Sequence, residues 1–215
     1  MEYLKITVLI SGGGTNLEAL IQAIDEQKIP ARVVQVISDS PQAYGLVRAR
    51  AHGIVARALT GHGESVQDEE SSELQLLNWL KKAETDLVVL AGYLKKIPPS
   101  VLAAYPNGIM NIHPSLIPSF SGAGWYGMKV HEGVWRRGVK ITGATVHFVN
   151  EEMDGGPIIL QESVHLSDKD DPPVIQQKVL AVEHRLLPRA VALFAAGSLR
   201  VQGHRVIIKE EVSGS

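Results

Sequence analysis

The first half of the chain alternates short apolar runs with segments whose apolar residues recur at helical spacing. The apolar runs predict strands at Ile6–Ile10, Val33–Ile37, Ile54–Ala58, Asp86–Gly92 and Gly108–His113. Helical spacing predicts helices from Leu17 to Ile24, around Ala43–Ala51, and through Leu74, Leu77 and Leu80 to near Glu84. Strands that alternate with helices form βαβ units, so we expect an α/β fold with a doubly wound, mostly parallel sheet.

The pattern changes after His113. Pro114–Trp125 is rich in proline, serine and glycine, which predicts a loop. Strands are expected at Ile141–Val149 and Pro157–Leu166, followed by a long helix over Ile175–Ala196 that bends near Pro188. Leu199–Val212 is expected to add an edge strand and then fray. These segments predict a C-terminal antiparallel extension of the sheet and a long C-terminal helix.

Composition narrows the class of protein. Of 215 residues, 45% are hydrophobic and 20% are charged, which is typical of a globular domain with a substantial core. A formal net charge of -2 argues against nucleic acid as a partner. The absence of cysteine excludes thiolate catalysis, disulfides and cysteine-ligated zinc.

The sequence also bears on where the protein resides and on whether it binds a metal. Met1–Lys5 shows no signal-peptide pattern, and no apolar segment approaches the roughly 20 residues that span a bilayer. We therefore expect a cytoplasmic protein that does not contact membranes. The histidines do not have the spacing of metal ligands, so we expect no metal.

A glycine-rich loop, Ser11–Asn16, lies between the first predicted strand and helix. Gly12, Gly13 and Gly14 let backbone N–H groups approach an anion, and a helix N-terminus favours negative charge. This pattern indicates a phosphate site. A dinucleotide site, with Asp39 on a ribose, is a rival that lacks the third glycine of its fingerprint. A tight turn capped by Thr15 or Asn16 is the structural alternative.

Asn111 and His113 end the fifth predicted strand. Residues two apart in a strand point to the same face, so the amide and the imidazole can address one spot. Such a pair can stabilise an oxyanion, and Asp154, followed by Gly155 and Gly156, is a candidate orienter of the imidazole. Alternatively, His113 is a structural residue and Asp154 pins a turn. His147 also lies in a predicted strand, where a structural role is favoured.

Two further segments allow both a structural and a functional interpretation. Leu90–Pro98 leaves the fourth predicted strand apolar and kinked, so it can line a pocket for a flat ligand, although spacing favours core packing of Leu94 and Ile97. Glu183 lies in the predicted C-terminal helix among apolar residues. A carboxylate in such a place is usually solvated, yet it can meet an amine.

The motifs resemble a known family. The matching segments are Ser11–Leu17, Val88–Tyr93, Asn111–Pro118, Val146–Val149 and Asp154–Ile158, and the resemblance runs from about Ile6 to Leu199. Together they resemble the phosphoribosylglycinamide formyltransferases, folate-dependent enzymes of purine synthesis with a Rossmann-like fold. The resemblance implies that 10-formyltetrahydrofolate, as co-substrate, gives its formyl group to the amine of glycinamide ribonucleotide.

The resemblance also implies residue roles within a single domain, residues 1–215. Residues 1–113 would form a phosphate-binding half, and residues 114–200 a catalytic-loop and folate-contacting half. The implied catalytic residues are Asn111, His113 and Asp154. The implied substrate-binding residues are Gly12, Gly13, Gly14, Thr15, Asn16, Pro114 and Glu183. The implied folate-binding residues are Leu90, Leu94, Lys95, Lys96, Ile97, Asn111, Val149, Asn150, Met153 and Asp154.

In the implied chemistry, Asn111 and a protonated His113 stabilise the oxyanion, while Asp154 orients the imidazole and helps to move a proton. The chain departs from the family pattern at two places. Glu64–Glu73 is acidic, where the family commonly has a basic residue near the folate tail, and it is expected to be a solvated loop leading into a helix. Ser121–Lys129 is longer than usual, with Lys129 where many members have histidine.

Four other functions are alternatives to this one. Methionyl-tRNA formyltransferases carry a further C-terminal domain, and formyltetrahydrofolate deformylases usually carry an extra N-terminal domain. An NAD-dependent oxidoreductase would use Gly12–Gly14 and Asp39, and it gives Asn111, His113 and Asp154 no shared role. A non-catalytic binding domain would need no such set of three. We expect small-molecule substrates as the partners, and a monomer or a weak homodimer.

Overall fold

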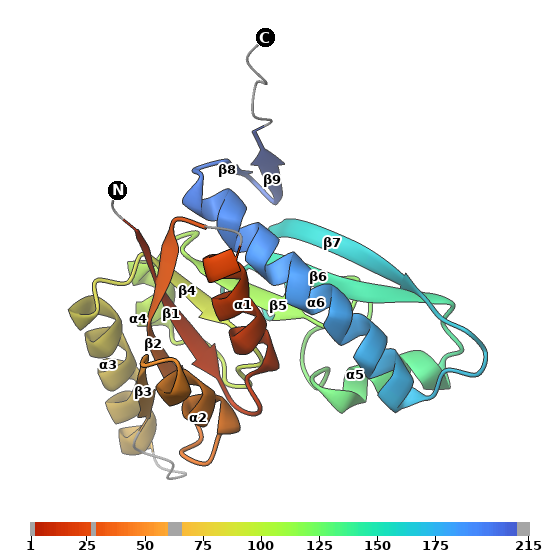
Figure 1. Ribbon diagram of the computed structural model, residues 1–215, viewed down its shortest axis with the longest axis horizontal. Coiled ribbons are helices and arrows are strands. Elements are labelled where there is room, and N and C mark those ends of the chain that lie inside the picture. Colours follow the sequence, from red (N-terminus) through yellow and green to blue (C-terminus); the bar gives the residue numbers. More distant parts are fainter. Residues whose placement is uncertain (1–2, 27–28, 60–65, 210–215) are drawn as a thin grey trace.

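The structure, a computed structural model, describes residues 3–26, 29–59 and 66–209, with side chains described outside residues 66–71 (Figure 1). Its strands are β1 (Leu4–Ile10), β2 (Ala31–Ser38), β3 (Val55–Ala58), β4 (Leu87–Leu90), β5 (Ile109–His113), β6 (Ile141–Phe148), β7 (Ile158–His165), β8 (Leu199–Gln202) and β9 (Arg205–Ile208). Its helices are α1 (Thr15–Glu26), α2 (Tyr44–Ala51), α3 (Val66–Lys82), α4 (Pro99–Ala104), α5 (Met128–Arg136) and α6 (Pro172–Ala195).

The described strands form one sheet in the order β3-β2-β1-β4-β5-β6-β7-β9-β8. Neighbours from β3 to β5 are parallel, and β6 pairs antiparallel with both β5 and β7. The strand order reverses between β1 and β4. Strands β2 and β3 lie on one side of β1, and the chain then crosses to the other side to form β4 and β5. Ligands of open α/β sheets bind beyond the carboxyl ends of the strands at such a switch point.

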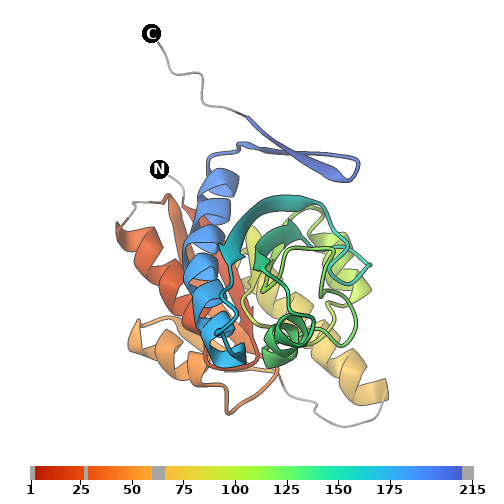
Figure 2. The ribbon, with the colours of Figure 1, turned by 90° about the vertical axis from the view of Figure 1, so that its right-hand side faces the viewer.

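Helices cover both faces of the sheet (Figures 1 and 2). The strands contribute alternate residues to two apolar cores, so Leu87 and Val89 of β4 join the core of α1, α2 and α6, whereas Val88 and Leu90 join that of α3 and α4. Because both faces are buried, the central strands read as continuous apolar runs rather than as alternating ones. The helices leave the carboxyl edge of the sheet free for loops that can bind ligands.

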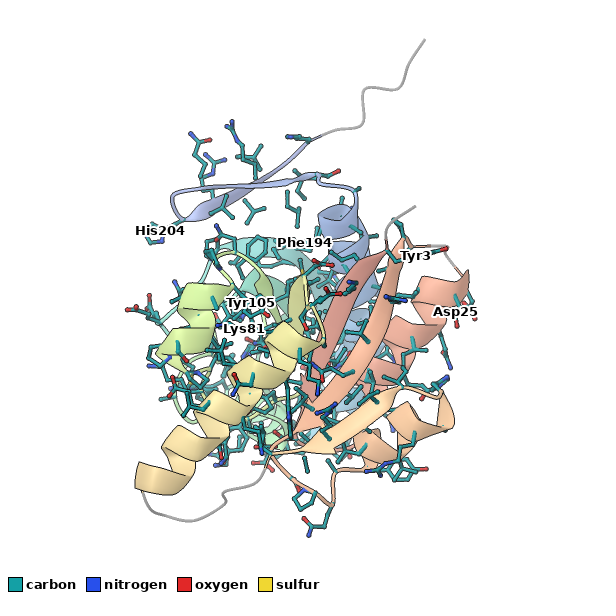
Figure 3. All side chains as sticks on the ribbon, turned by 90° about the vertical axis from the view of Figure 1, so that its left-hand side faces the viewer. Tyr3, Asp25, Lys81, Tyr105, Phe194 and His204 are labelled. Atoms are coloured by element: carbon teal, nitrogen blue, oxygen red, sulfur yellow. The ribbon has the colours of Figure 1, made fainter. Side chains whose placement is uncertain are left out.

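The predicted fold class is confirmed, with a mostly parallel sheet, an antiparallel C-terminal extension and a long C-terminal helix. Predicted and observed strand ends differ by two residues at most in the first seven strands. Helix α6 begins at Pro172 and passes through Pro188 without a break. The extension contains two strands rather than one, because β8 and β9 pair antiparallel across Gly203 and His204 (Figure 3). Residues 210–212 of the predicted frayed segment lie outside the described residues.

Two helices were not predicted and one segment was predicted wrongly. Helix α4 has six residues, too few for a periodic signal. Helix α5 follows a glycine-rich loop and has only Val130 and Val134 as an apolar stripe. The expected loop at Glu64–Glu73 is helical from Val66, where α3 begins, because Glu and Gln are good helix formers; residues 64–65 lie outside the described residues.

No helix in the described ranges is both long and apolar enough to cross a membrane.

The turn between β6 and β7 is held by a close backbone approach at Gly156. A Cβ atom there would overlap the carbonyl oxygen of Phe148, and Phe148 N–H also donates to Pro157 O at 2.9 Å. A Cβ at Gly155 would instead meet the side chain of Glu152, which is exposed and can move aside. Alanine should therefore be tolerated at position 155 and destabilising at position 156.

We predict that Gly156→Ala lowers the free energy of unfolding by about 1–3 kcal/mol, because backbone must shift to admit the methyl group. Gly155→Ala serves as the matched control and should change it by less than about 0.5 kcal/mol. Urea denaturation of both variants measures the difference. Equal effects of the two substitutions would show that this backbone contact does not constrain the turn.

Candidate active site

The glycine loop is clamped to the start of α2. The carbonyl oxygen of Gly12 accepts a hydrogen bond from Gly45 N–H at 3.0 Å, and that of Gly13 accepts one from Arg48 Nε at 2.9 Å. Gly14 has φ +72°, and a Cβ on it would lie 2.6 Å from Gly45 Cα. Glycine is needed at position 14 on both counts, because other residues adopt this φ at a cost and would also clash.

The loop presents free donors on its other side. Within the described part of the chain, the N–H groups of Gly13 and Gly14 donate no hydrogen bond. An added Cβ at Gly12 or Gly13 would have no atom within 4 Å, so these positions border open space. Free N–H groups beside the N-terminus of α1 are suited to an anion such as phosphate.

Asn16 and Glu183 form a buried pair beside this loop. Asn16 Nδ2 donates to Glu183 Oε2 at 2.6 Å, and the two side chains come from α1 and α6. Asn16 therefore does not cap the helix, and Glu183 is not solvated, because α1 packs against α6 and encloses both groups. Asn16 Oδ1 has no partner among the described residues. Burial raises the pKa of Glu183, although the hydrogen bond from Asn16 opposes the shift.

Asn111 and His147 lie opposite each other on adjacent strands, β5 and β6. Asn111 Nδ2 lies 3.1 Å from His147 Nε2, and His147 Nδ1 lies 2.8 Å from Phe148 O. A carbonyl oxygen accepts, so the proton of a neutral His147 is on Nδ1 and Nε2 accepts from the Asn111 amide. His147 therefore orients Asn111, a role that the sequence analysis did not favour.

His113 is buried, with both ring nitrogens facing protein groups. Nε2 lies 2.9 Å from Phe120 O, so Nε2 carries a proton and donates it. Nδ1 lies 3.5 Å from Asp154 Oδ2. Burial lowers the pKa of His113, while the charge of Asp154 and the bond to Phe120 O raise it; the net shift is downward. The protonated His113 expected from the sequence is therefore disfavoured before a substrate binds.

Asp154 lies between the two imidazoles. Its Oδ2 accepts from Gly122 N–H at 2.8 Å, and its Oδ1 lies 3.6 Å from His147 Nε2. Burial alone would raise the pKa of Asp154, but the imidazoles of His147 and His113 in their protonated forms, together with Gly122 N–H, outweigh it and hold the pKa below its usual value. Asp154 is therefore an anion in a partly buried site, and it has φ +55°.

The loop from Pro114 to Gly127 supplies two of these partners. Phe120 and Trp125 make an edge-to-face contact with centroids 5.2 Å apart. Trp125 occupies the space above Gly133 of α5, where a Cβ would collide with the indole. This packing anchors the loop segment that places Phe120 O on His113 and Gly122 N–H on Asp154. The sequence alone did not predict the contacts of this loop.

A further imidazole near His113, that of His131, was not identified from the sequence. His131 on α5 is 3% exposed, and its Nδ1 has no partner among the described residues. Burial and the neighbouring His113 lower the pKa of His131 to about 4. The available signal was helical spacing, because His131 lies three residues before Val134 and so shares the buried face of α5.

One cavity of about 320 Å³ opens at these residues, near the lower end of the range for small-molecule sites. It is lined by every residue expected to contact folate: Leu90, Leu94, Lys95, Lys96, Ile97, Asn111, Val149, Asn150, Met153 and Asp154. Pro114, His113 and His147 line it as well. The core position expected for Leu94 is wrong, because that side chain is 57% exposed at the cavity, whereas Ile97 is buried.

Glycine loop and cavity are distinct but linked. Residues 12–16 and Glu183 do not line the cavity. However, Ser11 N–H donates to Gly92 O at 3.1 Å, and Ser11 Oγ accepts from Leu94 N–H at 2.9 Å. The carboxyl end of β1 is therefore joined to the wall of the cavity. Asp39, the residue that a dinucleotide site would use, does not line this cavity.

Within residues 3–26, 29–59 and 66–209, no group of three or more histidine or acidic side chains is arranged to hold a metal ion.

We predict that Glu183→Gln becomes progressively more stable than the parent protein as the pH rises above 4.5. Burial raises the pKa of the folded carboxyl above its ordinary value of 4.5, so unfolding releases a proton between the two values and becomes more favourable with pH. Glutamine removes this loss. Urea denaturation at pH 4.5 and pH 8 measures the change, with exposed Glu151→Gln as the control. A pH-independent difference would contradict a raised pKa.

Comparison with known proteins gives a consistent match. The family model for formyl transferase matches residues 4–191. A phosphoribosylglycinamide formyltransferase from Escherichia coli (strain K12) is 35% identical over 92% of this chain and 90% of its own length. A chloroplastic protein of the same name from Arabidopsis thaliana is 37% identical over 87% of this chain, and the matched region spans 64% of that relative.

Solved structures agree with the sequence relatives. Glycinamide ribonucleotide transformylase 1 from Symbiobacterium toebii has a TM-score of 0.89 and 41% identity, covering 97% of this chain and 95% of that one. A formyltetrahydrofolate deformylase from Pseudomonas syringae pv. tomato has a TM-score of 0.86 and 26% identity, covering 97% of this chain and 66% of that one. The chain belongs to the formyl transferase family, within its group of phosphoribosylglycinamide formyltransferases.

Proposed function

We propose that this enzyme transfers the formyl group of 10-formyltetrahydrofolate to the amine of glycinamide ribonucleotide. The observation that carries the proposal is the meeting of Asn111, His113 and Asp154 at one wall of a cavity, beside a separate glycine loop with free N–H donors. One site suits a flat donor and the other suits a phosphate. Formyl transfer between two such ligands needs both.

The acceptor would bind along the carboxyl edge of β1. Gly12–Thr15 would hold its phosphate through backbone N–H groups. The buried Asn16–Glu183 pair lies next to this loop, and Asn16 Oδ1, which is buried without a partner among the described residues, would accept from a substrate N–H or O–H once the acceptor reaches it. Pro114 lines the cavity beside His113 and would contact the acceptor where the two sites meet.

The donor would occupy the cavity. Leu90, Ile97 and Val149 give it an apolar interior, and Leu94 and Met153 expose apolar surface at its opening. Lys95, Lys96 and Asn150 supply polar groups around the same opening. An apolar slot with a few polar groups is typical of sites for flat heterocyclic ligands.

Asn111 would stabilise the charge that develops during the reaction. The acceptor amine attacks the formyl carbon, a C–N bond forms, and the formyl oxygen becomes an oxyanion. One N–H of the Asn111 amide is held by His147, so the other is free to donate to that oxygen. A donor that is fixed before the reaction needs no reorganisation when the charge appears.

His113 and Asp154 would carry the proton. With Nε2 donating to Phe120 O, Nδ1 of neutral His113 holds the lone pair that faces Asp154. The proton lost by the attacking amine is stabilised between Nδ1 and this carboxylate, and it is then delivered to N10 of the donor as the C–N10 bond breaks. His113 is thus charged during the reaction, when its charge also favours the oxyanion.

A second candidate is hydrolysis of the donor, with water in place of the amine. The similarity to a solved formyltetrahydrofolate deformylase favours it, since the fold is shared over nearly the whole chain. A hydrolase has no need for a phosphate loop. The two activities are separated by following tetrahydrofolate release with and without glycinamide ribonucleotide. Release that requires the nucleotide supports transfer, release without it supports hydrolysis, and no release contradicts both.

We predict that Asn111→Ala and Asp154→Asn each lower kcat by roughly 100-fold or more, since each removes a group that acts on the transition state. Steady-state formyl transfer measures the loss, and circular dichroism checks that the variants fold. Asp168→Asn, the same change on an exposed carboxylate, is the control and should keep full activity. A folded Asn111→Ala or Asp154→Asn variant with near-normal kcat would contradict the assigned roles.

A further inference from the structure

Arg48 joins three elements at the back of the glycine loop. Its Nε donates to Gly13 O at 2.9 Å, and its Nη1 donates to Glu18 Oε2 on α1 at 3.4 Å. The guanidinium also lies over the ring of Tyr44, 5.1 Å from the centroid. Arg48 is therefore held by α1 and α2 while it bonds the loop between β1 and α1.

The bond to Gly13 O sets the direction of the neighbouring N–H group. In a trans peptide, C=O and N–H point in opposite directions. When Gly13 O is drawn towards Arg48, the N–H of Gly14 points away from α2, and the bond from Gly45 N–H to Gly12 O does the same for the N–H of Gly13. The two carbonyl bonds thus turn both N–H groups to the open side of the loop.

Arg48 itself lies on the carbonyl side, so it does not face an anion bound at the N–H groups. It acts on the anion through the loop. Its own place is secured by Glu18, which also contacts His52 Nε2 at 2.8 Å. The hydrogen bond from His52, and then the nearby charges of His52 and Arg48, hold the pKa of Glu18 below its usual value despite partial burial. The charged pair of Glu18 and Arg48 therefore persists at neutral pH.

We propose that Arg48 is a positioning residue that keeps the glycine loop in its anion-binding shape and so sets the affinity for the phosphate of the acceptor. The inference rests on the proposed function and adds a residue to it. Arginine suits the task because its rigid guanidinium donates to the loop carbonyl and to Glu18 in fixed directions at once. A lysine has one point of charge and cannot reproduce both bonds with the same geometry.

Substitution by methionine removes these donors and keeps an unbranched side chain of similar length. We predict that Arg48→Met raises KM for glycinamide ribonucleotide about tenfold or more, the size expected for losing a hydrogen bond from a charged group. kcat and KM for 10-formyltetrahydrofolate should change by less than about twofold. Glu18→Gln, which loosens the guanidinium without removing it, should give a smaller rise.

A dephosphorylated acceptor separates positioning from general damage. With the ribonucleoside of the same glycinamide, kcat/KM should be the same for the parent protein and Arg48→Met, because no phosphate engages the loop. Arg50→Met is the matched control: Arg50 is exposed on the same helix and its side chain has no hydrogen-bond or ion-pair partner among the described residues, so all parameters should stay normal.

Losses of equal size on both acceptors would overturn the proposal, since they would mark Arg48 as a general structural residue. An unchanged KM for the nucleotide would overturn it as well. If the parent protein transfers a formyl group to neither acceptor, the proposed function fails, and titration with inorganic phosphate followed by ³¹P NMR still tests Arg48. Weaker phosphate binding by Arg48→Met than by Arg50→Met would then support the positioning role, and equal binding would refute it.

Discussion

The carboxylate of Asp154 is the contact on which the geometry of the site depends. It accepts a hydrogen bond from Gly122 and lies within 3.6 Å of the imidazoles of His113 and His147, so it joins a loop and two strands at one point. The hydrogen bond from Gly122 offsets part of the cost of removing this charge from water, and a proton gained by His113 at Nδ1 would offset more of it. Without that charge, His113 would keep its bond to Phe120 and lose the group that favours its cationic form.

The sheet explains why the glycine loop and the cavity lie next to each other. Both β1 and β5 end at the same edge, and β4 lies between them in the sheet. The segment after β4 accepts from Ser11 N–H at Gly92 and donates to Ser11 Oγ at Leu94, so the glycine loop and the cavity wall share a hydrogen-bonded border. A ligand on the loop and a ligand in the cavity would therefore meet near His113, where a group can pass from one to the other.

The sequence was a good guide where local rules govern and a poor guide where distant segments meet. The two-residue period of a strand correctly placed Asn111 and His113 on one face, and glycine patterns located both turns of the site. The pairing of Asn16 with Glu183 joins residues 167 positions apart, and only the packing of α1 on α6 reveals it. The role of Phe120 could not be predicted from its side-chain type, because it acts through its backbone carbonyl. His147 was undervalued because its partner, Asn111, depends on the register between β5 and β6.

The central claim is that His113 and Asp154 form one buried, electrostatically coupled pair, and an NMR pH titration of the His113 ring tests it most directly. Comparison with His113→Gln would assign the resonance. The account predicts a pKa below the usual 6.5, because burial outweighs the charge of Asp154, and a further fall in Asp154→Asn, because that charge raises it. A His113 pKa at or above 6.5, or one that is unchanged in Asp154→Asn, would contradict the account.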